Sequence, residues 1–478
     1  GLFYYALEFF LSFNQIMEIW MLRLLPVFFL LIPIISYAKN VILFLGDGMG
    51  VSTVTSARIF EGQQLGKLGE EHSLSFDEFE NLALIKTYNT DAQVPDSAGT
   101  ISAILTGQKT RAGVSGVNAS VERGDCENSL TNQLPTILEM AEQRGMRSGI
   151  VSTARITHAT PAGAYAHYAE RNWEDNDDLS EAAVTHGCKD IAQQLVEFKH
   201  GDGVDVVLAG GRANFIPQYE ADPEYESRSG KRTDQRNLIS EWTENRKNRS
   251  YVWNLEGLRA LNPKTNDQVL GLFESSHMHF EADRLKDQAG EPALSDMTEF
   301  ALNKLNHKNN KGFFLLIEAG RIDHGHHAGN AYRALTDTVE LSKAVSIALK
   351  MVDLKETLII VTSDHSHTLT ISGYQARGNP ILGLARAGGH DVPDALGKPY
   401  TTLSYANGPG YLKEIPDLSK IDTKAIDYRQ LSTRPMYMET HAGEDVAAYA
   451  TGIASDMVRG TMEQNELFNV MHQALFNN

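Results

Sequence analysis

The sequence predicts an α/β protein with a large, mostly parallel central sheet flanked by helices on both faces. Short apolar, β-rich runs alternate along the chain with stretches of helical periodicity, which is the pattern of strands joined by covering helices. From residue 39 onward there is no repeat, low-complexity tract or linker-like Pro/Ser run. The regular part of the chain therefore reads as one sheet-based architecture.

The individual elements follow from local sequence. The helix expected at 134–144 ends before Gly145, and a second helix at 331–352 separates the last two expected strands. Residues 217–255 are polar and irregular, which favours a long surface excursion. Residues 372–436 are rich in Gly and Pro and are expected to form an inserted subdomain. The expected strands are 40–45, 148–152, 205–208, 312–317 and 357–362.

Composition excludes several classes of protein. With 478 residues, 42% hydrophobic and 22% charged, the chain is neither disordered, collagen-like nor a disulfide-dense miniprotein. Length alone would allow about three domains, although large α/β enzymes exceed that size. The 43 basic and 61 acidic residues give a formal net charge of −18, which argues against a nucleic-acid-binding role. A small anionic substrate would need concentrated local positive charge.

The first 38 residues resemble an export signal. A short basic start at Met21–Arg23 precedes an apolar run at 24–35, and small residues end at Ala38, where cleavage is expected. Residues 1–20 lie upstream of this start, and Gly1 is no initiator, so we interpret them as read-through or a fragment end; a longer apolar anchor is the alternative. The C-terminus has no lipid-anchor pattern. We expect an exported protein, periplasmic or extracellular, without a stable membrane anchor.

The chain has two cysteines, Cys126 and Cys188. In an exported protein such a pair favours a disulfide over a metal site, which would need more ligands. Two free buried thiols are the alternative.

Acidic side chains follow three of the expected strands. Asp47 comes after the first, Glu318 after the run at 312–317, and Asp364 after the run at 357–362, the last two with histidines nearby. The carboxyl ends of parallel strands lie along one edge of a sheet, where ligands bind. Each acid alone is equally consistent with a cap or a turn, but the three together predict one site.

The residue types indicate divalent metal ions. Carboxylates and imidazoles without thiolates suit zinc or magnesium. Asp323 and His327 are four residues apart and would share one face of a helical turn, whereas Asp364 and His365 are adjacent and could share a metal only from a bent loop. Clustered carboxylates repel one another unless cations lie between them.

Ser97 is a candidate nucleophile. It precedes a helix-like run at 101–105, so it would lie near a helix N-terminus, where free N–H groups stabilise an oxyanion or phosphate. Asp-Ser before a helix is more often only a cap. The Gly-x-Ser-x-Gly motif of hydrolase triads does not occur around Ser97.

These motifs together resemble the alkaline phosphatase family, from Lys39 to the C-terminus, and are closer to its animal enzymes than to the short enteric bacterial form. The evidence for the animal likeness is His158, His324 and the stretch 251–302. The matching stretches are GDGMG at 46–50, PDSAGT at 95–100, ARITHATPA at 154–162, ERNW at 170–173, EAGRIDHGHH at 318–327, TSDHSH at 362–367 and ETHAGEDV at 439–446.

The resemblance implies a phosphomonoesterase of broad specificity with two zinc ions and one magnesium ion. Ser97 would become a phosphoserine, and Arg171 would hold two phosphate oxygens. His158 is expected among the metal-site residues, and His324 is expected next to them. Both would tune the reaction rate and the metal preference. The implied ligands are Asp323, His327 and His441 for the first zinc, Asp47, Asp364 and His365 for the second, and Asp47, Thr160 and Glu318 for magnesium.

The resemblance also implies further features. Cys126 and Cys188 match a family disulfide, residues 372–436 resemble the crown insertion near the partner in a homodimer, and residues 39–478 would form the catalytic domain. A calcium site of the animal members is a fourth candidate, with Glu291 where the pattern has aspartate. Its candidate ligands are Glu224, Phe273 through its carbonyl, Glu274 and Glu291.

Two other functions share part of this pattern. A phosphodiesterase or sulfatase would use similar metals, but the Cys-x-Pro-x-Arg motif of sulfatases is absent and Arg171 suits a terminal phosphate. An inactive, metal-storing protein would lack a catalytic residue, whereas every expected position is filled.

Overall fold

The computed structural model describes residues 39–244, 247–265, 267–307 and 311–477, and the candidate signal segment lies outside the described residues. Among the described residues, no helix combines the length and apolar character that a bilayer span requires.

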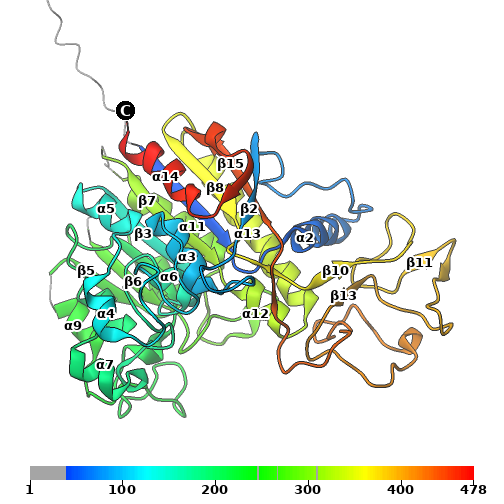
Figure 1. Ribbon diagram of the computed structural model, residues 1–478, viewed down its shortest axis with the longest axis horizontal. Coiled ribbons are helices and arrows are strands. Elements are labelled where there is room, and N and C mark those ends of the chain that lie inside the picture. Colours follow the sequence, from blue (N-terminus) through cyan, green and yellow to red (C-terminus); the bar gives the residue numbers. More distant parts are fainter. Residues whose placement is uncertain (1–38, 245–246, 266, 308–310, 478) are drawn as a thin grey trace, which may run out of the picture. The chain divides into compact units, whose positions relative to one another are not determined.

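A ten-stranded sheet runs through the described chain (Figure 1). Strand β15 is antiparallel to both of its neighbours, β2 and β8, and the other neighbouring strands of this sheet are parallel. The predicted fold class is therefore confirmed. In order across the sheet, the strands are β16 (Gly460–Glu463), β2 (Asn81–Lys86), β15 (Val446–Gly452), β8 (Thr357–Thr362), β1 (Asn40–Gly46), β7 (Phe313–Ala319), β3 (Arg147–Arg155), β4 (Val206–Gly210), β6 (Gln268–Leu272) and β5 (Arg249–Val252).

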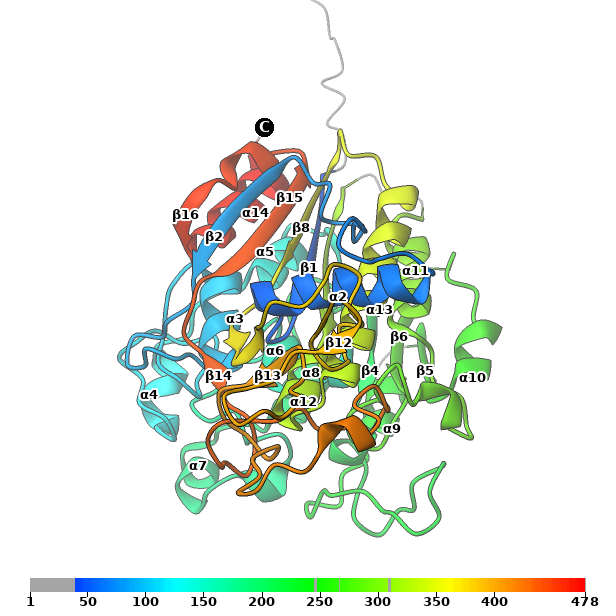
Figure 2. The same cartoon turned by 90° about the vertical axis from the view of Figure 1, so that its right-hand side faces the viewer.

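Helices cover both faces of this sheet (Figures 1 and 2). Alternate side chains of β1 enter two separate cores: Leu43 packs with α3, α5 and α14, whereas Phe44 packs with α2, α11 and α13. The helices are α2 (Val51–Gln64), α3 (Ser97–Thr106), α4 (Cys126–Thr131), α5 (Ile137–Gln143), α6 (Ala159–Ala162), α7 (Glu181–His186), α8 (Ile191–Val196), α9 (Leu238–Glu244), α10 (Leu255–Ala260), α11 (Leu294–Leu305), α12 (Arg321–His327), α13 (Ala331–Met351) and α14 (Glu466–Phe476).

The five predicted strands and two predicted helices are all present, with small changes in their bounds. Helix α5 begins at Ile137, three residues later than predicted. Thr136 forms a capping box there, because its hydroxyl accepts the Glu139 N–H at 3.2 Å and Glu139 Oε2 accepts the Thr136 N–H at 2.9 Å.

The expected surface excursion at 217–255 is only partly correct. Helix α9 places Leu238 and Trp242 in the core, and β5 joins the edge of the main sheet. Strand β5 is only partly buried, so its sequence lacks the apolar run that marks a central strand.

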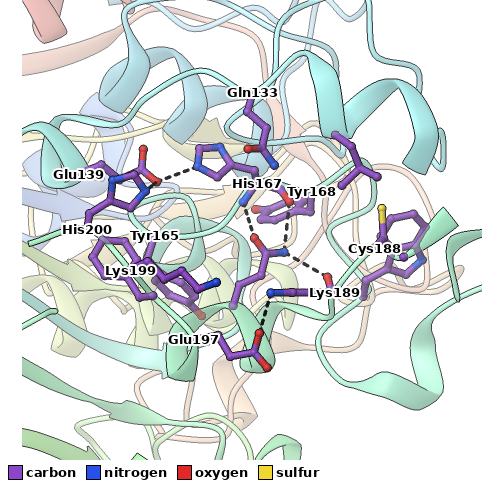
Figure 3. A pocket seen from close by; sticks show the side chains of 15 residues that line it. Gln133, Glu139, Tyr165, His167, Tyr168, Cys188, Lys189, Glu197, Lys199 and His200 are labelled. Carbon is purple, nitrogen blue, oxygen red and sulfur yellow. Dashed lines mark hydrogen bonds and ion pairs between the residues drawn. The ribbon is translucent and has the colours of Figure 1, made fainter.

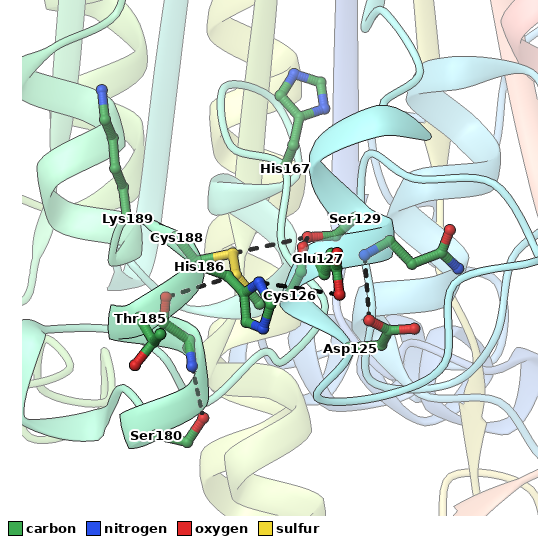
Figure 4. The surroundings of a disulfide bond; sticks show 12 residues. Asp125, Cys126, Glu127, Ser129, His167, Ser180, Thr185, His186, Cys188 and Lys189 are labelled. Carbon is green, nitrogen blue, oxygen red and sulfur yellow. Dashed lines mark hydrogen bonds and ion pairs between the residues drawn. A yellow bond between two sulfur atoms is a disulfide. The ribbon is translucent and has the colours of Figure 1, made fainter.

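A disulfide joins Cys126 and Cys188, whose Cα atoms are 6.0 Å apart, so the predicted bond is confirmed (Figure 4). It ties α4 to the end of α7 within a small hydrophobic cluster that includes Val117 and Trp173.

Residues 372–436 contain few regular elements and lie beside the main layers (Figure 1). The chain leaves the main sheet at the end of β8. After the segment it returns to a place near that point, because β14 pairs with β9 and places His441 opposite His367. The short pairs here are β9 (Ser366–His367) with β14 (His441–Ala442), β10 (Leu369–Ile371) with β13 (Leu403–Tyr405), and β11 (Arg386–Ala387) with β12 (His390–Asp391).

Candidate active site

The predicted acidic side chains meet at the carboxyl end of the central strands. Strand β1 lies between β7 and β8, so Leu45 is paired with Glu318 on one side and Thr362 on the other. Asp47 follows β1 directly, and Asp364 is the second residue after β8. Parallel pairing therefore brings three remote carboxylates to one place, as expected.

Asp47, Asp364 and His365 form the first group. His365 Nε2 lies 3.5 Å from Asp47 Oδ1 and 3.3 Å from Asp364 Oδ2. Asp364 and His365 lie in the bent connection between β8 and β9, which lets neighbouring residues face one centre. The Gly48 N–H donates to Asp364 Oδ1 at 3.0 Å. Gly48 has a φ of +67°, and a Cβ there would lie 2.3 Å from the His367 ring.

Asp323, His327 and His441 form the second group. The Nε2 atoms of His327 and His441 lie 3.3 and 3.4 Å from Asp323 Oδ1 and 3.3 Å from each other. Each imidazole has its Nδ1 next to a backbone carbonyl oxygen, of Glu439 at 2.5 Å and of Pro95 at 2.8 Å. Nδ1–H donation to these carbonyls leaves both Nε2 lone pairs available to a metal.

Asp47, Thr160 and Glu318 form the third group. All three are fully buried, and Asp47 Oδ1 and Oδ2, Thr160 Oγ1 and Glu318 Oε1 have no hydrogen-bond partner in the described structure. The second oxygen of Glu318 accepts a short hydrogen bond from the Ser152 hydroxyl. His158 has a ring nitrogen close to Asp47 and Glu318, so it borders this group.

The electrostatics of these groups call for cations. Burial, followed by repulsion from Asp364, raises the pKa of Asp47 well above its usual value. Burial also raises the pKa of Glu318 to about 7, with Asp364 adding to the effect. Buried oxygens without partners, together with oxygen and imidazole donors, fit divalent zinc and magnesium.

Ser97 is the first residue of α3, and its Oγ lies 3.2 Å from His365 Nε2. The capping role belongs to Asp96, whose Oδ1 accepts the Gly99 N–H at 3.1 Å. The two interpretations of this motif, a helix cap and a nucleophile, therefore apply to different residues: Asp96 caps the helix, and Ser97 faces the first group.

Arg171 supplies positive charge beside this serine. Its Nη1 donates to Asp96 Oδ2 at 3.1 Å, and its Nη2 lies 3.2 Å from His158 Nε2. The His158 and His324 rings lie 5.5 Å apart, and His277 approaches them at 5.2 and 4.1 Å. Burial lowers the pKa of all three imidazoles well below the usual value, so they are neutral.

The calcium candidates lie in a separate carboxylate cluster. Glu224 Oε1 and Asp287 Oδ2 are buried without hydrogen-bond partners, and burial followed by the contact with Asp287 raises the pKa of Glu224 to about 8. Tyr225 donates to Glu274 at 2.6 Å. Both oxygens of Glu291 are occupied, because His279 donates its backbone N–H to both of them and places Nδ1 2.9 Å from Oε1. Both oxygens of Glu274 also accept hydrogen bonds, since Ser275 N–H donates to Oε1 at 2.7 Å. The oxygens that fit calcium without losing a partner are therefore Glu224 Oε1 and Asp287 Oδ2.

Sequence reasoning missed several residues that shape these sites. His367 lies in the second group, with Nε2 2.7 Å from Asp323 Oδ1 and Nδ1 2.5 Å from Glu439 Oε2. Burial alone would lower the pKa of His367, but these two carboxylates outweigh it and raise the pKa to about 10. His367 and Glu439 lay within the quoted motifs at 362–367 and 439–446 but were given no role, whereas His277 and Asp287 carried no signal in the sequence.

Comparison with known proteins identifies relatives over nearly the whole chain. Residues 38–476 match the family model described as alkaline phosphatase. The chain is 46% identical over 448 residues to the tissue-nonspecific alkaline phosphatase of Rattus norvegicus, covering 92% of this chain and 84% of the relative. It is 44% identical to the human tissue-nonspecific isozyme with the same coverage, and 43% identical to alkaline phosphatase of Gadus morhua, covering 91% of each.

Solved structures share the fold at lower identity. Alkaline phosphatase of Thermus thermophilus superposes with a TM-score of 0.65 at 23% identity, covering 93% of both chains. The enzyme of the Antarctic bacterium TAB5 gives 0.62 at 22% identity, covering 93% of this chain and all of that one. With the family model matching almost the full described length, the chain belongs to the alkaline phosphatase family.

Proposed function

We propose that this protein hydrolyses phosphate monoesters through a phosphoserine at Ser97, with broad specificity for the alcohol. The Ser97 oxygen bonds to phosphorus as the ester P–O bond breaks and the alcohol leaves, and water then releases inorganic phosphate. The observation that carries the proposal is the position of Ser97 Oγ at the start of α3, 3.2 Å from His365 and beside the buried carboxylates. Family membership supports the same reaction.

Arg171 would bind the transferred phosphate. Its guanidinium offers paired N–H donors that match two phosphate oxygens, and Asp96 holds one of its nitrogens in place. This group supplies the local positive charge that an anionic substrate needs in a protein of net charge −18.

We infer two zinc ions and one magnesium ion for the three groups. Asp323, His327 and His441 would hold one zinc, and Asp47, Asp364 and His365 the other. When bound, a pair of divalent ions stabilises the attacking and leaving oxygens of an in-line displacement. Asp47, Thr160 and Glu318 would hold magnesium, and His158 and His324 would tune its neighbourhood. Variants of the TAB5 enzyme contain Mg in a site named M3.

We also propose calcium for the cluster around Glu224, Glu274 and Asp287. Its partnerless carboxylate oxygens support a hard cation with oxygen ligands. Of the other two predicted ligands, Glu291 is held by His279, and Phe273 would contribute only its carbonyl.

We infer export to the periplasm or the extracellular medium. The disulfide between Cys126 and Cys188 supports an oxidising compartment. We further propose that residues 39–478 act as one catalytic domain and that the crown-like insertion 372–436 lies near the partner in a homodimer.

The reaction class is tested by comparing kcat/KM for p-nitrophenyl phosphate and for its bis-ester. We expect a strong preference for the monoester, because Arg171 is placed to bind a terminal phosphate. A preference for the diester would assign the protein to a phosphodiesterase class.

A further inference from the structure

A cavity of about 290 Å³ lies near the disulfide, and Cys188 is among its lining residues. Tyr165, Tyr168 and Phe198 form part of its wall (Figure 3). None of the residues proposed for the phosphatase site lines it. Its polar lining includes the carboxylates of Glu139 and Glu197, the ammonium groups of Lys189 and Lys199, and two imidazoles. Glu139 and the two imidazoles next to it form a compact group.

The three side chains converge on one oxygen atom. Glu139 Oε1 lies 2.8 Å from His167 Nε2 and 3.2 Å from His200 Nε2. The side chain of Glu139 is only 3% exposed and that of His167 12%, whereas that of His200 is 37% exposed. Glu139 and His167 are therefore fixed inside the protein, whereas His200 lies at the surface, where an ion could enter from solvent.

Each of the three side chains has a further polar contact at the atom that does not face this group. His167 Nδ1–H donates to the Gly116 carbonyl oxygen at 2.7 Å, so its Nε2 faces Glu139. Glu139 Oε2 is held by the Thr136 N–H of the capping box at the start of α5. The Gln143 side-chain amide lies 2.8 Å from His200 Nδ1. Such outer contacts set the ring orientation of metal-binding histidines.

We propose that Glu139, His167 and His200 form a binding site for one transition-metal ion, Zn²⁺, separate from the phosphatase centre. Two imidazole nitrogens and one carboxylate oxygen are the ligand set of three-residue zinc sites, in which a water completes the coordination. The adjoining cavity has room for that water. When zinc binds, the Gln143 amide oxygen would accept the Nδ1–H of His200, leaving Nε2 for the metal.

The ion would join three separate parts of the chain. Glu139 lies in α5, His167 follows α6, and His200 follows α8. The cavity wall also reaches the phosphatase centre, because Tyr165 and Tyr168 donate their hydroxyls to the carbonyls of Ile156 and Ala159, on either side of His158. A zinc ion here would act as a structural clamp for this side of the site.

The test counts zinc in the holoenzyme after equilibration with Zn²⁺ and gel filtration. His200→Gln is the main variant, because its side chain is partly exposed and its loss should leave the fold intact. We expect this variant to contain one zinc ion per chain fewer than the wild type, with kcat/KM for phosphate monoesters unchanged. Gln143→Leu should retain the site but weaken zinc binding by about 10- to 100-fold.

His186→Gln is the matched control. His186 is also a partly exposed histidine beside a glutamate, with Nδ1 3.9 Å from Glu127 Oε2, but its pair includes no second histidine. We expect its zinc content to equal that of the wild type. Anomalous diffraction at the zinc edge should show a peak between Glu139, His167 and His200. Equal zinc counts in wild type and His200→Gln, or a crystal of the zinc-equilibrated enzyme without that peak, would overturn the proposal.

Discussion

Two histidine–carboxylate clusters in this protein differ in how many of their carboxylate oxygens have a hydrogen-bond partner within the polypeptide. At the end of β1, both oxygens of Asp47 are buried without a hydrogen-bond partner, and burial raises its pKa well above the usual value. Beside α5, both oxygens of Glu139 have partners, in His167, His200 and Thr136. An unsatisfied buried carboxylate is costly, whereas a satisfied one is not. The carboxylates of the first cluster therefore need cations or protons to compensate their charge, whereas Glu139 in the second is already compensated by its neighbours.

The largest effect is expected from Ser97→Ala. Because the proposed reaction passes through a phosphoserine, kcat/KM for p-nitrophenyl phosphate should fall by about 10³-fold or more. The metal ligands are untouched, so zinc content should remain at the wild-type value. Turnover close to that of the wild type would rule out the serine as nucleophile.

Arg171→Ala should lower kcat/KM by about 10²-fold, since two charge-assisted hydrogen bonds to phosphate are lost. The matched control is Arg123→Ala. Arg123 forms a bidentate pair with Glu170 but is 48% exposed, so its loss should change activity little. Equal losses in the two variants would show that Arg171 acts only through general surface charge.

The pH dependence of stability should differ between the clusters in the metal-free protein. Glu318 has a folded pKa of about 7 and an ordinary value of 4.5, so the folded state holds its proton more tightly. The free energy of unfolding should therefore fall by about 3 kcal/mol as the pH rises from about 4.5 to about 7. Urea unfolding at a series of pH values measures this, and Glu318→Gln should remove the decline.

Glu139 should show the opposite sign. Burial alone would raise its pKa, but the hydrogen bond and charge of His167, the Thr136 N–H and nearby His200 together outweigh burial and lower it. Its contribution to stability is therefore present above pH 4.5 and is lost as the pH falls through the lowered pKa. If Glu139→Gln and Glu318→Gln shifted the pH profile in the same direction, the contrast between the two clusters would be wrong.

The smallest effect is expected from His200→Gln in the metal-free protein. The 37%-exposed His200 adds only a solvent-screened contact to Glu139, so the free energy of unfolding should change by less than about 1 kcal/mol. Thermal unfolding of chelator-treated wild type and variant checks this. A much larger decrease in the free energy of unfolding would mean that the cluster depends on His200 even without metal.

The predicted and missed strands occupy different parts of the sheet. The five predicted strands are neighbours at its centre, in the order β8, β1, β7, β3 and β4, where burial on both faces produces an apolar run such as β1. The missed strands lie at either end. Strand β2 alternates buried and exposed residues, and β5 is largely half-buried, so neither produces such a run.

The site residues also divide into those that the sequence could predict and those that it could not. Asp47, Asp364 and His365 could be predicted because they follow recognisable strands and lie within distinctive motifs. The contributions of His277 and Asp287 could not, since neither residue type is unusual in its local sequence. Glu139, His167 and His200 lie in three separate segments, and they meet only because α5 and α8 both contribute side chains to the same hydrophobic core.

Sequence alone determined the fold class and the family, because these depend on local apolar runs and on motifs that can be recognised without knowledge of contacts. It favoured a disulfide over two free thiols, and the structure decided between them. Only the tertiary structure decided which carboxylates lack partners, that His279 holds Glu291, and that two remote imidazoles share the oxygen of Glu139. The physical reason is that hydrogen bonding and charge compensation depend on distances of a few ångströms between atoms far apart along the chain.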